Sequence, residues 1–259
     1  MMRKLRKQLF TGLSVILIAF SAFRLYDDKP VIHSIGDSTM CNFEESYLNK
    51  FGGADYPIRG WMQMMPEFVK PGIKINNAAR SGRSSKSFRD EGLWDNVKVK
   101  IKKGDYVFIM FGGNDQKPDS LRHSDPWTGY KQNLINYVKE TKELGANPVL
   151  FTSIVRRKFD KNGKLVDTYG DYTLAVREVA KELNVNLIDL NQLSAELVQN
   201  YGVEKSKELF LYIEPGRFSK LPEGKKDDSH LCIEGARRIA ELAAKSMKEQ
   251  KLPIAEYLK

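Results

Sequence analysis

Residues 30–39 read Pro-Val-Ile-His-Ser-Ile-Gly-Asp-Ser-Thr, an apolar run that ends in a glycine turn and a serine. Such a continuous run is typical of a strand that is buried on both faces of a parallel sheet. Four later runs have the same character, and they are Ile73–Asn77, Tyr106–Phe111, Pro148–Thr152 and Asn186–Asp189. The sequence therefore predicts a mainly parallel sheet of roughly five strands.

Helical patterns separate these runs. Residues 130–144 carry apolar side chains at helical spacing and end at Gly145, and residues 174–183 and 233–250 show the same spacing. Strand–helix alternation requires right-handed crossovers, which place helices on both faces of the sheet. We therefore expect an α/β fold, a three-layer α/β/α sandwich. No linker or repeat divides residues 25–259, so they are predicted to form one domain.

The first 24 residues differ from the rest of the chain. They contain five basic residues and no acidic ones, and the 15 residues from Leu9 to Phe23 are mostly apolar. This pattern indicates an export signal, because the apolar stretch is short for a membrane span. We expect the mature protein to be periplasmic or extracellular. An N-terminal segment that stays uncleaved as a membrane anchor is the alternative.

Charge and cysteine content narrow the classes of partner. The net charge is +9, and removing the five basic residues of the leader leaves +4. No nucleic-acid-binding motif accompanies this charge, so we expect no nucleic-acid partner, and no stable membrane contact beyond the N-terminal segment. Cys41 and Cys232 allow at most one disulfide, and two separate thiols are the favoured interpretation.

Three polar clusters supply the parts of a serine hydrolase. Ser38 follows the first predicted strand, residues 112–115 (Gly-Gly-Asn-Asp) follow the third, and residues 227–230 (Asp-Asp-Ser-His) form a predicted loop far downstream. Active sites of parallel sheets lie at the carboxyl ends of the strands, so these clusters can meet there. A serine attacks an acyl carbon, a histidine takes its proton and an aspartate orients the imidazole. The amide of Asn114 can donate to the developing oxyanion.

Other chemistries lack their sequence signatures. There is no Gly-x-Ser-x-Gly elbow, Walker loop or dinucleotide-binding fingerprint. Two distant cysteines, with His33 expected to be packed and His123 expected to be solvated, do not form a zinc site. We expect neither a metal nor an organic cofactor.

Four blocks of sequence resemble the SGNH (GDSL-like) hydrolases, and more narrowly their rhamnogalacturonan acetylesterase-like branch. The blocks are Gly36–Met40, Asn77–Phe88, Phe111–Lys117 and Asp227–His230. The likeness spans roughly residues 30–245. One departure is Gly113, because members of this branch often have histidine at that position.

The resemblance implies roles for individual residues. Ser38 would be the nucleophile, His230 the base and Asp227 the carboxylate that orients it. Asp228 is the rival carboxylate, but an acid three residues before the histidine is the family's spacing.

The resemblance also implies an oxyanion hole. Its donors would be the backbone amides of Ser38 and Gly82 and the side chain of Asn114. Glycine suits such a donor, since a backbone N–H approaches a substrate most closely when no Cβ is present.

Residues near the predicted oxyanion loop are candidates for substrate binding. Arg80, Arg83 and Lys86 could bind uronate carboxylates, or they could form a solvated basic face. Trp61 and Trp94 could each stack on a sugar ring or belong to the core.

These observations predict an exported serine esterase that removes O-acetyl groups from a polysaccharide through an acyl-enzyme. The resemblance favours pectic rhamnogalacturonan as the substrate. Rival substrates are acetylated xylan, an acetylated cell-wall glycan, or a lysophospholipid or thioester. A catalytically silent carbohydrate-binding protein on the same fold is the alternative from another class.

Overall fold

The apolar runs form a five-stranded parallel sheet, as predicted. The computed structural model describes residues 29–259, and Val31–Lys259 form one compact unit. The sheet order is β2-β1-β3-β4-β5, with every neighbouring pair parallel. The predictions for residues 1–24 fall outside the described residues. The strands are β1 (Val31–Gly36), β2 (Lys74–Asn77), β3 (Tyr106–Met110), β4 (Asn147–Phe151) and β5 (Asn186–Ile188).

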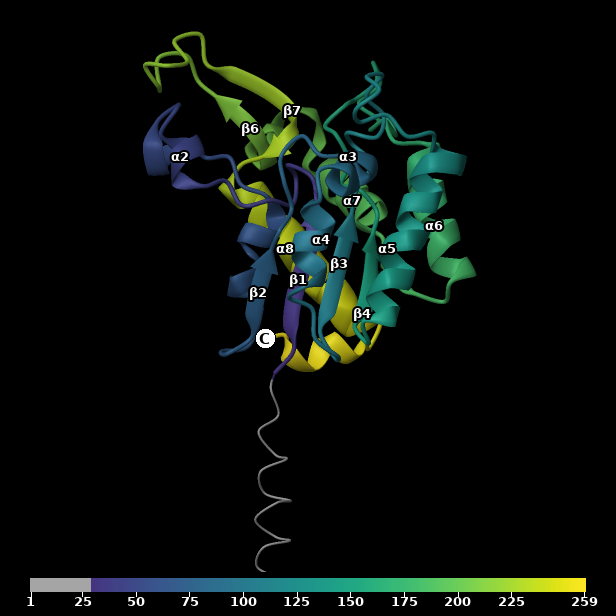
Figure 1. Ribbon diagram of the computed structural model, residues 1–259. Helices are drawn as coiled ribbons and strands as arrows, with labels where there is room; N and C mark the ends of the chain where they lie inside the picture. The colour runs from purple at the N-terminus through teal and green to yellow at the C-terminus, as the bar shows by residue number, and fades with distance from the viewer. Residues whose placement is uncertain (1–28) are drawn as a thin grey trace, which may run out of the picture. The chain divides into compact units, whose positions relative to one another are not determined.

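Helices cover both faces of this sheet (Figure 1). Successive side chains of a strand point to opposite faces, so Val107 and Ile109 pack into one core while Phe108 and Met110 pack into the other. The first core is closed by α3 (Ser85–Asp90), α4 (Leu93–Lys98), α5 (Lys131–Glu143) and α6 (Asp171–Glu182), and the second by α7 (Leu190–Lys205) and α8 (Ile233–Glu249). The predicted three-layer α/β/α sandwich is confirmed.

Short helices fill the connections. They are α2 (Glu45–Leu48), a π-helix (Pro126–Tyr130) and the 3-10 helices Gly53–Asp55, Trp61–Gln63, Met65–Glu67, Ser206–Leu209 and Pro253–Tyr257.

A small antiparallel ribbon was not predicted. The strand β6 (Phe210–Ile213) pairs with β7 (Lys225–Leu231), opposing Leu211 to Asp227. The prediction that residues 227–230 form a loop is wrong, because they lie in β7. Strand β7 reads Lys-Lys-Asp-Asp-Ser-His-Leu, so it lacks the apolar run by which the other strands are recognised. The ribbon lies beyond the carboxyl ends of β1 and β3 (Figure 1).

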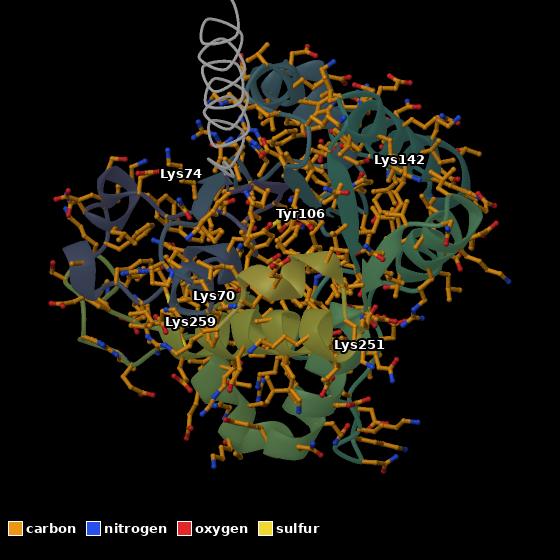
Figure 2. All side chains as sticks on the ribbon, turned by 90° about the horizontal axis from the view of Figure 1, so that it is seen from below. Lys70, Lys74, Tyr106, Lys142, Lys251 and Lys259 are labelled. Atoms are coloured by element: carbon orange, nitrogen blue, oxygen red, sulfur yellow. The ribbon has the colours of Figure 1, made fainter. Side chains whose placement is uncertain are left out.

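The opposite end of the sheet faces the viewer in Figure 2. Tyr106, the first residue of β3, lies near its centre, and lysines at positions 70, 74, 142, 251 and 259 lie around it. Within residues 29–259, no helix is long and apolar enough to cross a membrane. The same part of the chain brings no three metal-ligating side chains together into a metal site.

Candidate active site

A tight turn after β1 presents Ser38. The buried Asp37 holds this turn, because its Oδ1 accepts hydrogen bonds from the Thr39 amide (2.9 Å) and the Thr39 hydroxyl (2.8 Å). Gly36 starts the turn where β1 approaches β3 so closely that a Cβ would lie 2.6 Å from the Met110 carbonyl oxygen. The glycine of the Gly-Asp-Ser motif is therefore a packing requirement of the turn that positions Ser38.

Ser38, His230 and Asp227 form a continuous chain of hydrogen bonds. His230 Nε2 lies 3.0 Å from Ser38 Oγ, and His230 Nδ1 lies 2.9 Å from Asp227 Oδ2. The other oxygen of Asp227 accepts from the backbone amides of Ser229 and His230, both at 3.0 Å. Residues 192 positions apart in the chain thus meet at the carboxyl end of β1, in the order that nucleophilic catalysis requires.

The electrostatics keep Asp227 ionised. Burial raises the pKa of this carboxyl, but the hydrogen bonds and charge of His230, with the Ser229 amide, outweigh burial and set the pKa well below its usual range. Lys225 adds a cation 3.5 Å away. An ionised Asp227 favours a proton on His230 Nδ1, so Nε2 is left to accept the Ser38 hydroxyl proton.

A buried arginine anchors the strand that carries His230. Arg157 donates from its guanidinium to Asp228 Oδ1 at 2.8 Å and from its backbone amide to the Asp228 carbonyl, also at 2.8 Å. The guanidinium also donates to Ser206 Oγ, and the Tyr212 hydroxyl donates a hydrogen bond to Asp228 Oδ1 at 2.6 Å. Isolated two-stranded ribbons are only marginally stable, so these bonds fix β7 to the rest of the domain. The rival carboxylate Asp228 is therefore bound to Arg157, and Asp227 is the one on His230.

The predicted oxyanion donors come from two adjoining loops. Gly82 has a φ of +79°, in the left-handed region that favours glycine, and no atom of residues 29–259 lies within 4 Å of where its Cβ would be. Asn114 follows β3, is almost fully buried and donates from Nδ2 to the Arg83 carbonyl at 3.1 Å. The Gly82 loop is tied to the Ser38 turn, because the Arg80 amide donates to the Gly36 carbonyl at 2.9 Å. An asparagine amide has two N–H groups, so Asn114 keeps one for a ligand.

The carboxylate of Asp115, the residue after Asn114, is also buried. Asp115 accepts from the Ser85 amide at 3.0 Å and from the Ser85 hydroxyl. Burial is the main cause that raises the pKa of Asp115 to about 7, and the nearby Asp37 adds to it. No motif in the sequence gives Asp115 a role of its own. The structure shows that it joins the Asn114 loop to the start of α3.

The space around Gly113 is already occupied. A Cβ at Gly113 would lie 3.1 Å from Asp37 Oδ2 and 3.3 Å from the Tyr169 hydroxyl. The Arg156 guanidinium stacks 4.4 Å from the Tyr169 ring centre and donates to the Gly113 carbonyl at 3.4 Å. A histidine here would have to displace these groups. Arg156 and Tyr169 were missed because they lie between β4 and α6, in a stretch without a recognisable motif.

The predicted basic cluster separates into paired and unpaired residues. Arg83 forms an ion pair with Glu91 at 2.8 Å, and Lys86 forms one with Asp90 at 2.5 Å. Arg80 is exposed and forms no ion pair within residues 29–259. Of the three cations, Arg80 is the one whose charge is left for a ligand.

The tryptophans belong to the core. Trp61 is fully buried and packs against Phe151 with ring centres 5.3 Å apart, so it cannot stack on a sugar. The prediction that Trp61 binds substrate is wrong, because its large apolar ring is buried in the hydrophobic core and a ligand cannot reach it. Trp94 is also buried and donates from Nε1 to Glu140 at 2.7 Å.

The two cysteines are separate thiols. Cys41 is buried and its sulfur lies 3.7 Å from the Ser38 carbonyl, while Cys232 is partly buried and lies 2.9 Å from the Glu208 carbonyl. Burial raises the pKa of Cys41 to about 12, so this thiol stays protonated beside the turn.

Comparisons with known proteins show the family of the chain. Residues 34–211 match the model of the GDSL-like lipase/acylhydrolase family. The chain is 38% identical to rhamnogalacturonan acetylesterase RhgT of Bacillus subtilis (strain 168) over 231 residues, covering 89% of this chain and 95% of that protein. It is 33% identical to the probable rhamnogalacturonan acetylesterase YesY of the same organism, over 88% of this chain and 96% of YesY.

Solved structures share the fold. The crystal structure of the YxiM protein from Bacillus subtilis superposes with a TM-score of 0.73 at 26% identity, covering 87% of this chain and 58% of that chain. The acetylxylan esterase Axe2 from Geobacillus stearothermophilus superposes with a TM-score of 0.57 at 19% identity, covering 84% of this chain and 94% of Axe2.

Proposed function

The chain belongs to the GDSL-like lipase/acylhydrolase family and is a carboxylic-ester hydrolase, and on this premise we propose that it is a serine esterase that removes O-acetyl groups from pectic rhamnogalacturonan. The observation that carries the proposal is the hydrogen-bond chain from Ser38 through His230 to Asp227. The names of the relatives RhgT and YesY support the acetyl group and the polysaccharide.

The reaction follows from the contacts in the site. Ser38 Oγ attacks the acetyl carbonyl carbon while His230 Nε2, 3.0 Å away, takes its proton. The oxyanion forms against the amides of Ser38, Gly82 and Asn114. The sugar alcohol then leaves with the proton from His230. Water, activated by the same nitrogen, attacks the acyl-enzyme and frees acetate.

We also propose that the enzyme acts outside the cytoplasm. This rests on the basic and apolar pattern of residues 3–23, which fits export, and on the size of a polysaccharide substrate. Detection of the protein in the medium or periplasm, with its N-terminus sequenced, tests both export and cleavage.

Acetate release from acetylated rhamnogalacturonan and acetylated xylan, measured side by side, tests the proposed function. The variant Ser38→Ala is the blank, since removing the nucleophile abolishes acyl-enzyme formation and leaves only the residual catalysis of the hole. We expect Ser38-dependent release mainly from the pectic polymer. Release mainly from xylan would preserve the mechanism and overturn the substrate. No release from either, together with inertness to a serine-directed organophosphonate, would favour the silent binding protein.

A further inference from the structure

A polar groove lies beside the candidate site along the edge strand β2. We call it the β2-edge groove. Its volume is about 220 Å³, and its walls come from the Ser38 turn, β2, the Gly82 loop and α4. Figure 1 shows β2 at the edge of the sheet. The lining residues that matter here are Asn42, Asn76, Asn77, Arg80, Asn96 and Lys100.

Hydrogen bonds of Asn77 join one wall of the groove to the residues that follow Ser38. Asn77 Nδ2 donates to the Met40 carbonyl at 3.0 Å and to Asn42 Oδ1 at 2.8 Å. Both N–H groups of Asn77 are used in these bonds, and Asn42 Oδ1 is the acceptor of one of them. Asn42 Nδ2 has no hydrogen-bond partner within residues 29–259. Asn42, which lines the groove four residues after Ser38, carries this unpaired donor.

The side walls also offer unused hydrogen-bonding atoms. Asn76 Nδ2 donates to His33 Nδ1 at 2.9 Å, and the acceptor Oδ1 of Asn76 has no hydrogen-bond partner among residues 29–259. The exposed side chain of Asn96, on α4, makes no hydrogen bond within the described part of the chain. Amides that are fixed at one end and unpaired at the other are suited to sugar hydroxyls, which both donate and accept.

Two cations give the groove its charge. Arg80 and Lys100 are both exposed, and neither forms an ion pair in the part of the chain that the structure describes. Glu44 is the acid among the lining residues. By contrast, Arg83, three residues after Arg80, is neutralised by Glu91. The groove thus combines excess positive charge with amides, which fits a hydroxylated ligand that carries a carboxylate.

The groove and the reactive serine share their framework. The Arg80 amide donates to the Gly36 carbonyl at 2.9 Å, two residues before Ser38. Asn42 and Arg80, which line the groove, thus belong to the segments that carry Ser38 and Gly82, so this end of the groove adjoins the candidate site.

We propose that the β2-edge groove is a subsite for a uronate residue of the substrate chain. Arg80 and Lys100 supply the positive charge that attracts the carboxylate, and Asn42, Asn76 and Asn96 bind the hydroxyls. The inference rests on the proposed function for its glycan ligand, and it adds where a charged sugar of that glycan is held.

Binding measured in the Ser38→Ala protein tests the subsite apart from catalysis. Isothermal titration calorimetry of the full chain, at about 0.15 M salt to screen distant charges, would use a deacetylated rhamnogalacturonan oligosaccharide and its carboxyl-reduced counterpart. We expect Arg80→Gln and Lys100→Gln each to weaken binding of the acidic oligosaccharide about three- to fivefold. Both variants should leave the weaker binding of the reduced oligosaccharide unchanged.

Two variants of matched charge serve as controls. Arg83→Gln removes an arginine of the same loop that is already paired, and Lys102→Gln removes an exposed lysine near Lys100 that does not line the groove. We expect both to bind the acidic oligosaccharide like the parent protein. Urea unfolding of every variant shows whether it is folded.

Equal weakening by control and groove variants, or no binding of the acidic oligosaccharide to the parent, would overturn the subsite. Acetate release by the wild type is measured separately, because it tests the proposed esterase activity and not the subsite. Release together with unaltered binding in Arg80→Gln would retain the esterase and remove the subsite. Weakened binding in Arg80→Gln, together with no acetate release by the wild type, would retain the subsite and overturn the proposed esterase activity.

Discussion

Two histidine–carboxylate pairs lie at opposite ends of the same sheet. At the carboxyl end, His230 Nδ1 lies 2.9 Å from Asp227, and at the amino end His33 Nε2 lies 3.1 Å from Asp105. The side chain of His230 is 32% exposed, whereas that of His33 is 2% exposed. The second nitrogen of His230 faces the Ser38 hydroxyl. The His230–Asp227 pair can therefore transfer a proton to and from Ser38, whereas the His33–Asp105 pair is buried in the core.

The partner of the second nitrogen makes the difference. Asn76 donates its amide to His33 Nδ1 at 2.9 Å, so His33 carries its proton on Nε2 and donates it to Asp105. Asp105 also accepts from the backbone amides of Val31 and Lys102, both at 2.8 Å. These hydrogen bonds join β1, β2 and β3 at this end of the sheet. A histidine–carboxylate pair is therefore catalytic only when its free nitrogen meets an ionisable nucleophile that a substrate can reach.

The largest contrast is expected between the two carboxylates. Asp227→Asn should lower kcat about 10⁴-fold, because the amide no longer holds the His230 tautomer or stabilises its imidazolium. Asp105→Asn should leave kcat within about threefold and lower the free energy of unfolding by about 1–3 kcal/mol, because it unpairs buried donors. Acetate release and urea unfolding measure the two quantities.

The outcome that breaks the comparison is an equal effect at both ends. If Asp105→Asn lowered kcat as far as Asp227→Asn while its unfolding free energy stayed native, the amino-terminal pair would have to act in catalysis. The distance between the two ends of the sheet would then have to be bridged by a change in structure.

Two asparagines sharpen the contrast at the next level. Asn114→Ala should lower kcat about 10²- to 10³-fold, equivalent to about 2.7–4 kcal/mol of barrier, because it removes an oxyanion donor. Asn76→Ala removes an amide that donates to His33, so it should cost about 1–3 kcal/mol of stability and leave kcat within about threefold, while the loss of its Oδ1 from the β2-edge groove should appear in KM. A fall of less than about threefold in kcat for folded Asn114→Ala would contradict the oxyanion assignment.

Local sequence was sufficient to predict one of these ends. The five strands are buried apolar runs, and Ser38 and Asn114 follow two of them directly, so their shared edge could be predicted. The Asp227–His230 spacing is contained within four residues. These features depend on neighbours in the sequence, and the structure places them together.

The other features depend on contacts between distant residues. Arg157 and Asp228 are 71 residues apart, and His33 and Asp105 are 72 apart. Neither pair leaves a periodic pattern, because a single buried polar contact does not alter the spacing of apolar residues. Trp61 was misjudged for the same reason, since tertiary packing decides whether a tryptophan is covered.

The anchor of β7 is the next test, with a smaller effect. Arg157→Met should lower kcat about tenfold with little change in KM, because looser placement of His230 misaligns it with Ser38. It should also cost about 2 kcal/mol of stability by removing charged hydrogen bonds. Arg157→Lys should recover part of the kcat. Arg177→Met, which removes a half-exposed ion pair with Asp189, is the control that should change neither quantity much.

The smallest expected effect is the pH dependence that His33 gives to stability. Burial lowers the pKa of His33 below its ordinary value of 6.5, with the nearby Lys100 adding to this and the bond to Asp105 opposing it. The folded state therefore favours neutral His33, so this stability is complete above about pH 6.5 and is lost as the pH falls through the folded-state pKa. Unfolding free energies of wild type and His33→Gln, measured from pH 5 to 8, isolate the effect.

The difference between the two proteins should shrink below pH 6.5, by at most about 1.4 kcal/mol per pH unit. A difference that grows as the pH falls would mean that Asp105 outweighs burial and holds His33 protonated. Both ends of the sheet could then stabilise an imidazolium beside a carboxylate. The position of the proton would no longer distinguish them, and the hydroxyl of Ser38, with its access to substrate, would alone separate the catalytic pair from the structural one.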